Sequence, residues 1–308
     1  MIGFFKHPKA YIVFSSEYLI GVSTYGDHNS FDIFKYKRIR DRLISDKLLK
    51  VKHILYPQPC SFSDISLVHT PKFIRQIKDP LYVNHALKIE LNSMWDNTVL
   101  EYYKAVSGGT VFAAFNALNL RKPVFNLGGG FHHSQPDKAE GFCLINDVAI
   151  AIKKIKAKTN IKNVMIIDLD YHQGNGNSII FKEDESVFTF SVHADCWTKL
   201  DAVSNRDVLV SSDISDREYL RKIELNLSEI LKTFKPELIF YIAGSDPYSK
   251  DLLADMKISK QAMLDRNLYV LKKSNEVKSP IVILPGGGYG PNSWEIYYEF
   301  IKTTLKGI

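Results

Sequence analysis

The residues with the clearest capacity for chemistry lie in one short stretch, residues 164–176, which reads Val-Met-Ile-Ile-Asp-Leu-Asp-Tyr-His-Gln-Gly-Asn-Gly. Its first four residues are apolar and typical of a buried strand. Asp168, Asp170 and His172 follow at alternate positions, and alternate side chains of an extended backbone point to the same side. Three such groups are costly to bury without partners, and a divalent metal accepts both aspartate oxygen and histidine nitrogen as ligands. The stretch therefore predicts a metal site; a structural cluster of Asp–His hydrogen bonds is the alternative.

Four other apolar runs also end in residues that could do chemistry. Each run is typical of a strand, and glycine, histidine, aspartate or tyrosine follows it. Together with the run at 164–167, the five runs and the residues that follow them are 123–127 before Gly128–His133, 164–167 before Asp168–Gly176, 187–192 before His193, 238–243 before Gly244–Asp246, and 281–284 before Pro285–Tyr289. Helical patterns separate or follow these runs at about 145–158, 216–233, 259–274 and 293–305.

This alternation predicts an α/β fold with a central parallel sheet and helices on both of its faces. In such sheets ligands bind outside the carboxyl ends of the strands. The residues expected at that edge are His132, His133, Asp170, His172, His193, Asp246 and Tyr289. Because they share one edge of one sheet, we expect a single domain over residues 1–308.

The patterns before residue 120 are shorter. The expected elements there are strands at 11–14 and 51–55, and helices at 32–50 and 98–119. Thr70 is a suitable cap for a short helix that begins at Pro71. Gly108 and Gly109 lie inside the longest of these helices, where each costs about 1 kcal/mol relative to alanine. The pair indicates either close packing against another element or a kink.

Asp170, His172 and Asp246 would together form a ligand set of mixed oxygen and nitrogen. Three protein ligands with one open position is the arrangement of catalytic zinc, which lowers the pKa of a bound water to about 7. Asp168 would either orient a histidine or bind a separate cation. The ligand types alone leave iron and manganese open.

His132 and His133 follow three glycines, which let the backbone approach a ligand closely. Adjacent histidines on a turn need different partners, and one of them suits a base that activates water and then protonates an amine leaving group. Tyr289 could donate its hydroxyl to a developing oxyanion, and Phe142 could wall a channel. The alternatives are two satisfied turn histidines, an exposed loop tyrosine and a packed phenylalanine. His193 fits a core role as well as a functional one.

Composition is that of an ordinary globular protein. Of 308 residues, 45% are hydrophobic and 24% are charged, which suffices for a sizeable core. The formal charge of +6 is spread along the chain among acidic residues, which favours a mixed surface over direct nucleic-acid binding. Cys60, Cys143 and Cys196 show no paired spacing, and no apolar run reaches membrane-spanning length. We expect a cytoplasmic protein with reduced thiols; its oligomeric state stays open.

Five segments together resemble the zinc-dependent histone deacetylase family, which also includes acetylpolyamine amidohydrolases and acetoin-utilisation proteins. The segments are Gly128–His133, Glu140–Asp147, Asp168–Gly176, Ala243–Asp246 and Pro285–Tyr289, in the family's order and spacing. Residues 69–74 and 107–110, which precede these segments, also match the family's pattern. The resemblance therefore spans about residues 10–305. The Gln-Gly-Asn-Gly and Ala-Gly-Ser-Asp forms are most similar to the class IV branch and its bacterial relatives.

The resemblance implies an arginase-like α/β fold, one Zn²⁺ ion and defined roles at the sheet edge. The implied zinc ligands are Asp170, His172 and Asp246. The implied catalytic residues are His133 as general base and acid, His132 paired with Asp168 for charge stabilisation, and Tyr289 as the group that polarises the scissile carbonyl. The implied walls of the acyl channel are Gly141 and Phe142. A structural monovalent cation, usually K⁺, is implied at Asp168, Asp170, His172, Ser191 and Val192.

Three places depart from the family's pattern. The loop after the third run reads Ala-Asp-Cys-Trp-Thr-Lys, so Trp197 would replace a channel aromatic that faces Phe142, or the channel would be open on that side. Asn175 stands where some classes have an aspartate, and a neutral amide stabilises a His133 imidazolium less than a carboxylate does. Residues 26–31 have no family signature and would border the mouth of the site.

These features predict a zinc-dependent amidohydrolase that removes acetyl or longer acyl groups from N-acyl-lysine side chains of proteins by metal-activated water. A deacetylase of acetylated polyamines or other small N-acyl amines is the alternative within the family. An arginase-type dimetal enzyme would need a second acidic cluster, and Gly-Ser-Asp-Pro247 offers one carboxylate there rather than two in tandem. A catalytically weak module that binds acyl-lysine or a partner protein is the alternative of another class.

Overall fold

The computed structural model describes residues 8–19, 32, 34–87, 98–199 and 201–307, and the expected mouth segment 26–31 lies outside them. Its centre is an eight-stranded sheet in the order β2-β1-β3-β8-β7-β4-β5-β6, in which all neighbouring strands are parallel. The strands are β1 (Tyr11–Val13), β2 (Ile54–Leu55), β3 (Val124–Asn126), β4 (Val164–Asp168), β5 (Val187–His193), β6 (Asn205–Leu209), β7 (Leu238–Ile242) and β8 (Ile281–Leu284). The predicted parallel α/β fold is confirmed.

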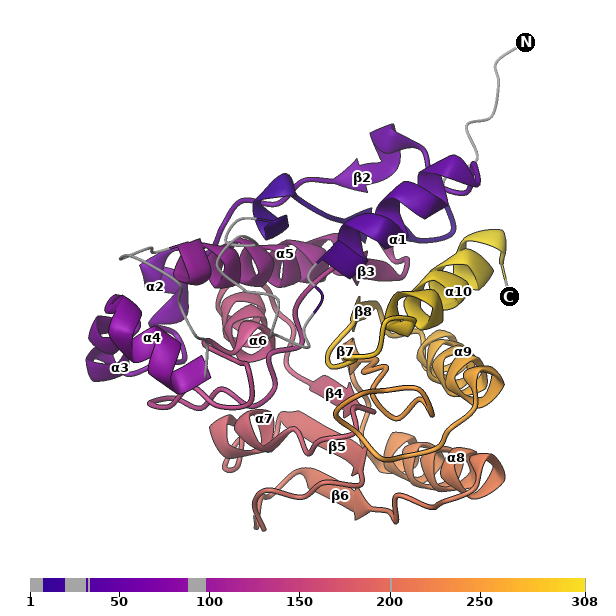
Figure 1. Ribbon diagram of the computed structural model, residues 1–308. Helices are drawn as coiled ribbons and strands as arrows, with labels where there is room; N and C mark the ends of the chain where they lie inside the picture. The colour runs from indigo at the N-terminus through magenta and orange to yellow at the C-terminus, as the bar shows by residue number, and fades with distance from the viewer. Residues whose placement is uncertain (1–7, 20–31, 33, 88–97, 200, 308) are drawn as a thin grey trace.

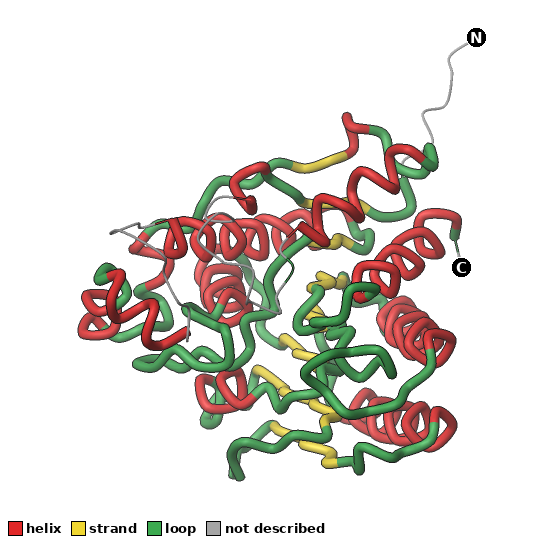
Figure 2. Tube along the Cα trace, viewed as in Figure 1, coloured by secondary structure: helices red, strands yellow, loops and turns green. Residues whose placement is uncertain are grey.

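Helices cover both faces of this sheet, and Figure 2 shows the strands and connecting loops between the two groups. One face has α5, α6 and α7, and the other has α8, α9 and α10 (Figure 1). Helix α1 packs against α10. The helices are η1 (Ser16–Leu19), α1 (Phe34–Ser45), η3 (Val51–His53), α2 (Phe62–Ile65), α3 (Pro71–Gln76), α4 (Pro80–Leu87), α5 (Thr98–Leu120), α6 (Asp147–Lys158), α7 (Asn175–Ile180), α8 (Asp216–Thr233), α9 (Lys260–Glu276) and α10 (Ser293–Lys306).

The central strands are buried on both faces, which explains their continuous apolar sequences. Every residue of β4, β7 and β8 is buried. The edge strand β6 was not predicted, because its sequence Asn-Arg-Asp-Val-Leu is only half-buried and has no apolar run. The expected strand at 51–55 is wrong in its first part. Residues 51–53 form a short 3₁₀ helix, and only Ile54 and Leu55 pair with β1.

The two glycines inside α5 are sites of close packing. A Cβ atom on Gly108 would lie 2.0 Å from the carbonyl oxygen of Gln58, and one on Gly109 would lie 1.7 Å from the Tyr18 hydroxyl. That hydroxyl donates a 2.7 Å hydrogen bond to Oδ1 of Asn126, the last residue of β3. These contacts favour the packing interpretation, and they bring α5 against the strand that leads into the glycine turn.

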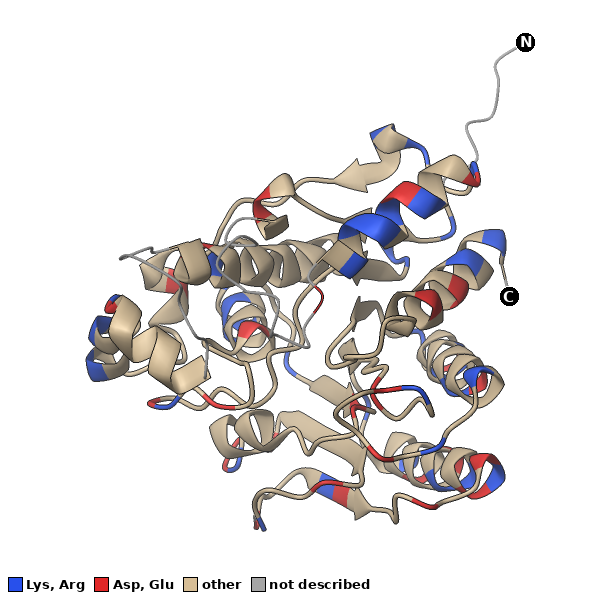
Figure 3. Cartoon of the chain, viewed as in Figure 1, with Lys and Arg blue, Asp and Glu red and all other residues tan. Residues whose placement is uncertain are grey.

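The short helix α3 begins as predicted, with Pro71 at its first position and the Thr70 hydroxyl accepting a 3.2 Å hydrogen bond from the Phe73 N–H. The preceding His69 is buried, and its Nε2 accepts a 3.0 Å hydrogen bond from the Asn146 N–H at the start of α6. Figure 3 shows basic and acidic positions interspersed along the helices, with several basic positions on α1. None of the described helices is long and apolar enough to cross a membrane.

Candidate active site

Loops rich in glycine and polar residues meet at one edge of the sheet. Strands β3, β8, β7, β4 and β5 are consecutive in the sheet, and they are the five strands whose ends the sequence singled out. The loops that follow them contain His132 and His133, Tyr289, Asp246, Asp170 and His172, while His193 ends β5. Because the strands are parallel, their carboxyl ends lie at the same edge, so the predicted residues are brought together.

Asp170, His172 and Asp246 form a compact group in which the potential ligand atoms all lie within 4.8 Å of one another. His172 Nδ1 lies 3.1 Å from Asp170 Oδ1 and 3.1 Å from Asp246 Oδ2. Both aspartates are fully buried. Across the described part of the chain, no second group of three such residues is found, so the second acidic cluster of a dimetal enzyme is not present there.

The electrostatics of this group fit a bound cation. Burial and the neighbouring Asp170 carboxylate raise the pKa of Asp246 to about 7. Burial lowers the pKa of His172, but hydrogen bonds to both carboxylates outweigh it and raise that pKa to about 11. Two buried carboxylates in such proximity repel each other, and a divalent cation among the three side chains relieves the repulsion. Two oxygens and one nitrogen form the donor set of a catalytic metal site, in which water or substrate supplies the remaining ligand.

Backbone N–H groups fix the carboxylates of this group. Gly287 N donates to Asp170 Oδ2 at 2.7 Å, and Tyr171 N donates to Asp246 Oδ1 at 3.0 Å. A Cβ atom on Gly287 would lie only 2.4 Å from Asp246 Oδ2, and one on Gly244 would lie 2.3 Å from Asp170 Oδ2. Glycine is therefore required at both positions for the loops to close around the two aspartates.

A buried arginine on α9 donates hydrogen bonds to the two loops that contain Asp170 and Asp246. Arg266 Nη1 donates to the carbonyl oxygen of Leu169 at 2.6 Å, and its Nη2 donates to that of Gly244. Leu169 directly precedes Asp170, and Gly244 lies two residues before Asp246. Arg266 is fully buried. Nothing in the sequence indicated this role, because one arginine in an amphipathic helix is ordinarily exposed.

Helices α10 and α1 hold the glycine loop before Tyr289. The Tyr297 hydroxyl lies 2.5 Å from the carbonyl oxygens of both Pro285 and Gly287. Lys35 is fully buried, and its Nζ donates to the Gly288 carbonyl oxygen at 2.7 Å. Burial lowers the pKa of Lys35 to about 8. Neither contact was predicted.

His132 is paired with a carboxylate. Its Nδ1 lies 2.7 Å from Asp168 Oδ2, and Asp168 Oδ1 accepts from the Asp170 N–H at 3.2 Å. Burial lowers the pKa of His132, but Asp168 and Asp170 outweigh it and raise that pKa to about 9. The environment therefore favours the imidazolium form of His132 at neutral pH.

His133 has the opposite environment, although its ring centroid lies 4.0 Å from that of His132. Its Nδ1 lies 2.7 Å from Asn175 Oδ1, so its partner is neutral. Burial and the neighbouring His132 hold the pKa of His133 well below its ordinary value. Its ring stacks on Trp197, with centroids 3.9 Å apart and planes 9° apart. The environment favours a neutral His133, as a general base requires.

The glycine turn that contains these histidines is fixed by Asp147, the first residue of α6. Its two carboxylate oxygens accept hydrogen bonds from the Phe131 N–H at 2.7 Å, the Gly130 N–H at 3.0 Å and the Thr110 hydroxyl at 2.5 Å. Asp147 is fully buried, so these three donors satisfy it where water cannot. Asp147 lies in one of the five segments of the resemblance, but the sequence did not indicate its role.

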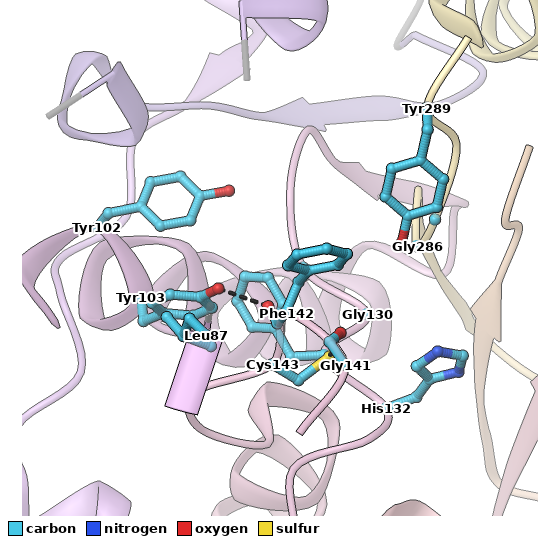
Figure 4. Close-up of a pocket in the computed structure, with 13 residues that line it drawn as sticks. Leu87, Tyr102, Tyr103, Gly130, His132, Gly141, Phe142, Cys143, Gly286 and Tyr289 are labelled. Atoms are coloured by element: carbon cyan, nitrogen blue, oxygen red, sulfur yellow. Dashed lines mark hydrogen bonds between the residues drawn. The ribbon is translucent and has the colours of Figure 1, made fainter. Parts of the chain in front are cut away.

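A cavity lies between the glycine turn after β3, the loop after β8 and residues 141–143 (Figure 4). Its lining residues are Leu87, Tyr102, Tyr103, Gly129, Gly130, Phe131, His132, Gly141, Phe142, Cys143, Gly286, Gly287 and Tyr289. Figure 4 shows Phe142 between Tyr103 and Tyr289, and the Tyr103 hydroxyl donates to the Phe142 carbonyl oxygen. The Tyr289 ring lies 6.0 Å from the Phe142 ring and 6.5 Å from the His172 ring. Burial and the nearby aspartates raise the pKa of Tyr289 well above its ordinary value, so its hydroxyl keeps its proton.

The loop with Trp197 is held by Gln173, a residue of the segment Asp168–Gly176 to which the sequence assigned no role of its own. Gln173 Oε1 accepts from the Trp197 N–H at 3.0 Å and the Thr198 N–H at 2.9 Å. The indole Nε1 donates to Asp195 Oδ2 at 2.8 Å. These contacts place the Trp197 ring flat against His133, so that Trp197 packs on the proposed base.

The residues expected to bind a monovalent cation lie together on β4, β5 and the loop after β4. Asp168 and Ser191 are register partners in the β4–β5 pair, and Val192 is the next buried residue of β5. Ser191 Oγ lies 2.8 Å from His193 Nδ1, which places His193 beside this group rather than in the metal triad. Potassium at this place stays a prediction.

Comparisons with known proteins agree with this geometry. A model of the histone deacetylase domain matches residues 29–302. Histone deacetylase 2 of Arabidopsis thaliana is 31% identical over 97% of this chain and 79% of its own length. An acetoin utilization protein of Staphylococcus aureus is 26% identical over 88% of this chain and 74% of its own length. The crystal structure of an HDAC homolog from Aquifex aeolicus matches with a TM-score of 0.80 at 23% identity, covering 97% of this chain and 84% of that one, which shows a shared fold.

Proposed function

Because this chain belongs to the histone deacetylase domain family, we propose that it is a zinc-dependent hydrolase that removes acetyl or longer acyl groups from lysine side chains of proteins. The observation that supports this most is the compact Asp170–His172–Asp246 group beside two histidines with different partners, the Asp168 carboxylate for His132 and the Asn175 amide for His133. Protein lysine is proposed over a polyamine because the 31% identical relative is named as a histone deacetylase. The Gln-Gly-Asn-Gly and Ala-Gly-Ser-Asp forms favour the class IV branch.

Asp170, His172 and Asp246 would hold the zinc ion, since their donor atoms and burial fit it. When bound, zinc lowers the pKa of a water molecule and polarises an amide carbonyl. A structural K⁺ ion is proposed at Asp168, Asp170, His172, Ser191 and Val192, because Asp168 at the end of β4 pairs in register with Ser191 of β5.

His133 would accept the proton of the attacking water at Nε2, since Nδ1 is engaged by Asn175. The same Nε2 would then return the proton to the leaving lysine nitrogen. His132, protonated against Asp168, would stabilise negative charge that develops on the substrate.

Tyr289 would donate its hydroxyl to the oxygen of the scissile amide as negative charge develops there. Phe142 and Gly141 would flank the lysine stem or the acyl group, because both line the cavity beside Tyr289. Trp197 would add an aromatic wall over His133.

Two substitutions separate metal binding from catalysis. Asp246→Ala removes a ligand, so zinc and turnover should be lost together. Tyr289→Phe keeps all three ligands, so it should retain zinc and lose at least about 100-fold in kcat, as expected for an oxyanion donor. Zinc is measured by elemental mass spectrometry, and turnover by mass spectrometry of acyl-lysine peptides. Wild-type kcat in Tyr289→Phe would contradict the oxyanion role, and a zinc-loaded wild type without turnover on any acyl amide would favour the binding module.

A further inference from the structure

We propose that Glu140 is a positioning residue for His133 and acts through the side-chain amide of Asn175. The inference rests on the proposed function, in which His133 Nε2 needs a free lone pair to accept a proton. Asn175 Oδ1 lies 2.7 Å from His133 Nδ1, and Asn175 Nδ2 donates to Glu140 Oε2 at 3.1 Å. The three side chains therefore form one hydrogen-bonded line that ends at the imidazole.

Glu140 decides which end of the Asn175 amide faces His133. The two ends of an amide have nearly the same shape but opposite hydrogen-bonding character. A carboxylate only accepts hydrogen bonds, so Glu140 takes the NH₂ end and leaves the oxygen toward His133. An oxygen can only accept from Nδ1, so the neutral imidazole must have its proton on Nδ1 and its lone pair on Nε2. A reversed amide would select the other tautomer and remove the base.

Glu140 is itself held firmly enough to act in this way. Gln135 Nε2 donates to the same Oε2 at 3.0 Å, and Lys138 forms an ion pair with Oε1. The backbone of Glu140 exchanges two hydrogen bonds with Cys143, of 3.1 and 2.8 Å. Its side chain is 25% exposed, so the carboxylate remains in contact with solvent while it faces Asn175.

Packing fixes the position of the His133 ring but does not choose its tautomer. Trp197 covers one face of the ring, and the space beside its edge is so small that a Cβ atom on Gly141 would lie 2.2 Å from Cδ2. Neither contact distinguishes a proton on Nδ1 from one on Nε2. That choice depends on the hydrogen-bond partner of Nδ1, which Asn175 and Glu140 supply.

Three variants test the pair. Glu140→Ala frees the amide to rotate, and Asn175→Asp places a second carboxylate against Glu140. The double variant Asn175→Asp/Glu140→Gln restores a complementary pair. The NH₂ group of the introduced glutamine can donate to the new carboxylate and, after rotation of the Gln135 amide, to the Gln135 oxygen, while its own oxygen accepts from Lys138. We expect each single variant to lose about tenfold or more in kcat and the double variant to recover to within about threefold of wild type. Asp137→Asn is the control, because it removes an exposed carboxylate of the same turn without touching Asn175.

The decisive readout is the tautomer of His133. Nitrogen-15 NMR of the full-length, zinc-loaded protein, labelled at histidine and recorded at one neutral pH, distinguishes the two nitrogens. The signals of His133 are identified by their absence in His133→Asn. We expect the proton on Nδ1 in wild type and Asp137→Asn, and a substantial population with the proton on Nε2 in Glu140→Ala.

A wild-type tautomer in Glu140→Ala overturns the inference, even if turnover falls, because the residue would then be merely structural. If Glu140→Ala does not fold, the test is the comparison of Asn175→Asp with the double variant. A double variant whose kcat is no higher than that of Asn175→Asp then overturns the inference. A tautomer shift in a protein that hydrolyses no acyl amide supports the positioning role while rejecting the proposed function.

Discussion

Two adjacent histidines of the same glycine turn have opposite charge preferences because their partners differ. His132 faces the Asp168 carboxylate, whereas His133 faces the Asn175 amide and an indole ring. The residue pattern predicted that the two histidines need different partners, and only the family resemblance assigned the role of general base to His133. That distinction depends on contacts with residues 36 and 42 positions away, which only the folded chain defines.

The proposed metal ligands were easier to predict, because two of them lie at alternate positions directly after an apolar strand. Asp170 and His172 share that local pattern, and Asp246 follows another strand of the same kind. Glu140 and Gln173 had no such local signal. A polar residue in a loop is ordinarily solvated, and only the contacts with Asn175 and Trp197 show what these two residues do.

Gly141 is a position where one methyl group should disable the site. Its φ is +55°, and an added Cβ would lie 2.2 Å from His133 Cδ2 and 2.8 Å from Trp197 Cη2. Gly141→Ala must therefore displace the base or its stacking partner. We expect kcat to fall at least about tenfold with zinc content unchanged, because a misplacement of about 1 Å can cost that much or more.

The control for backbone strain is Gly307→Ala, at φ +96°, where the added methyl meets only the flexible end of Lys9. This variant should lose a small amount of stability and no kcat. Equal loss of kcat in the two variants would show that backbone strain, rather than contact with His133, explains the effect.

At the scale of elements, helices position the site by buried polar side chains that reach loops beyond the sheet. Four such side chains contact backbone groups of the loops that form the candidate site: Arg266 of α9, Tyr297 of α10, Lys35 of α1 and Asp147 of α6. Periodicity predicted the helices themselves, because their apolar faces recur at helical spacing. It could not predict these contacts, because the partner of a buried polar group lies far away in the sequence.

His69 links α3 to α6 and should make the stability of the protein depend on pH. Its Nε2 accepts a hydrogen bond from Asn146, and burial lowers its pKa from 6.5 in the unfolded chain to about 4. Below about pH 6.5 the unfolded chain therefore binds a proton that the folded protein does not, so the free energy of unfolding falls as pH is lowered. Acidification from about pH 6.5 to about pH 4 should therefore lower the free energy of unfolding by about 3 kcal/mol through His69 alone.

Urea unfolding at several pH values measures this dependence. His69→Gln can still accept from Asn146 but does not titrate, so its free energy of unfolding should fall less steeply than that of the wild type on acidification. His85→Gln, at an exposed position of α4, is the control for the loss of a histidine elsewhere in the chain. Parallel curves for the wild type and His69→Gln would show that His69 is not the group responsible.

At the scale of the whole molecule, strand order brings the chemistry together. Strands β3, β8, β7 and β4 are neighbours in the sheet although they are far apart in sequence, so loops near residues 130, 170, 245 and 288 converge. The alternation of strands and helices predicted a shared edge, but it did not predict this order. It also did not predict strand β6, because β6 is an edge strand without an apolar run.

We propose that the loops at this sheet edge form the active site of a zinc-dependent lysine deacylase. The most direct test is mass-spectrometric deacylation by the protein in metal-free and zinc-loaded forms. The substrates should be acetyl-lysine peptides, long-chain acyl-lysine peptides and acetylated polyamines. We predict turnover of lysine peptides that appears with zinc, disappears with a chelator and collapses in Tyr289→Phe. Turnover confined to polyamines, equal turnover with and without metal, or none on any acyl amide with zinc bound would contradict the claim.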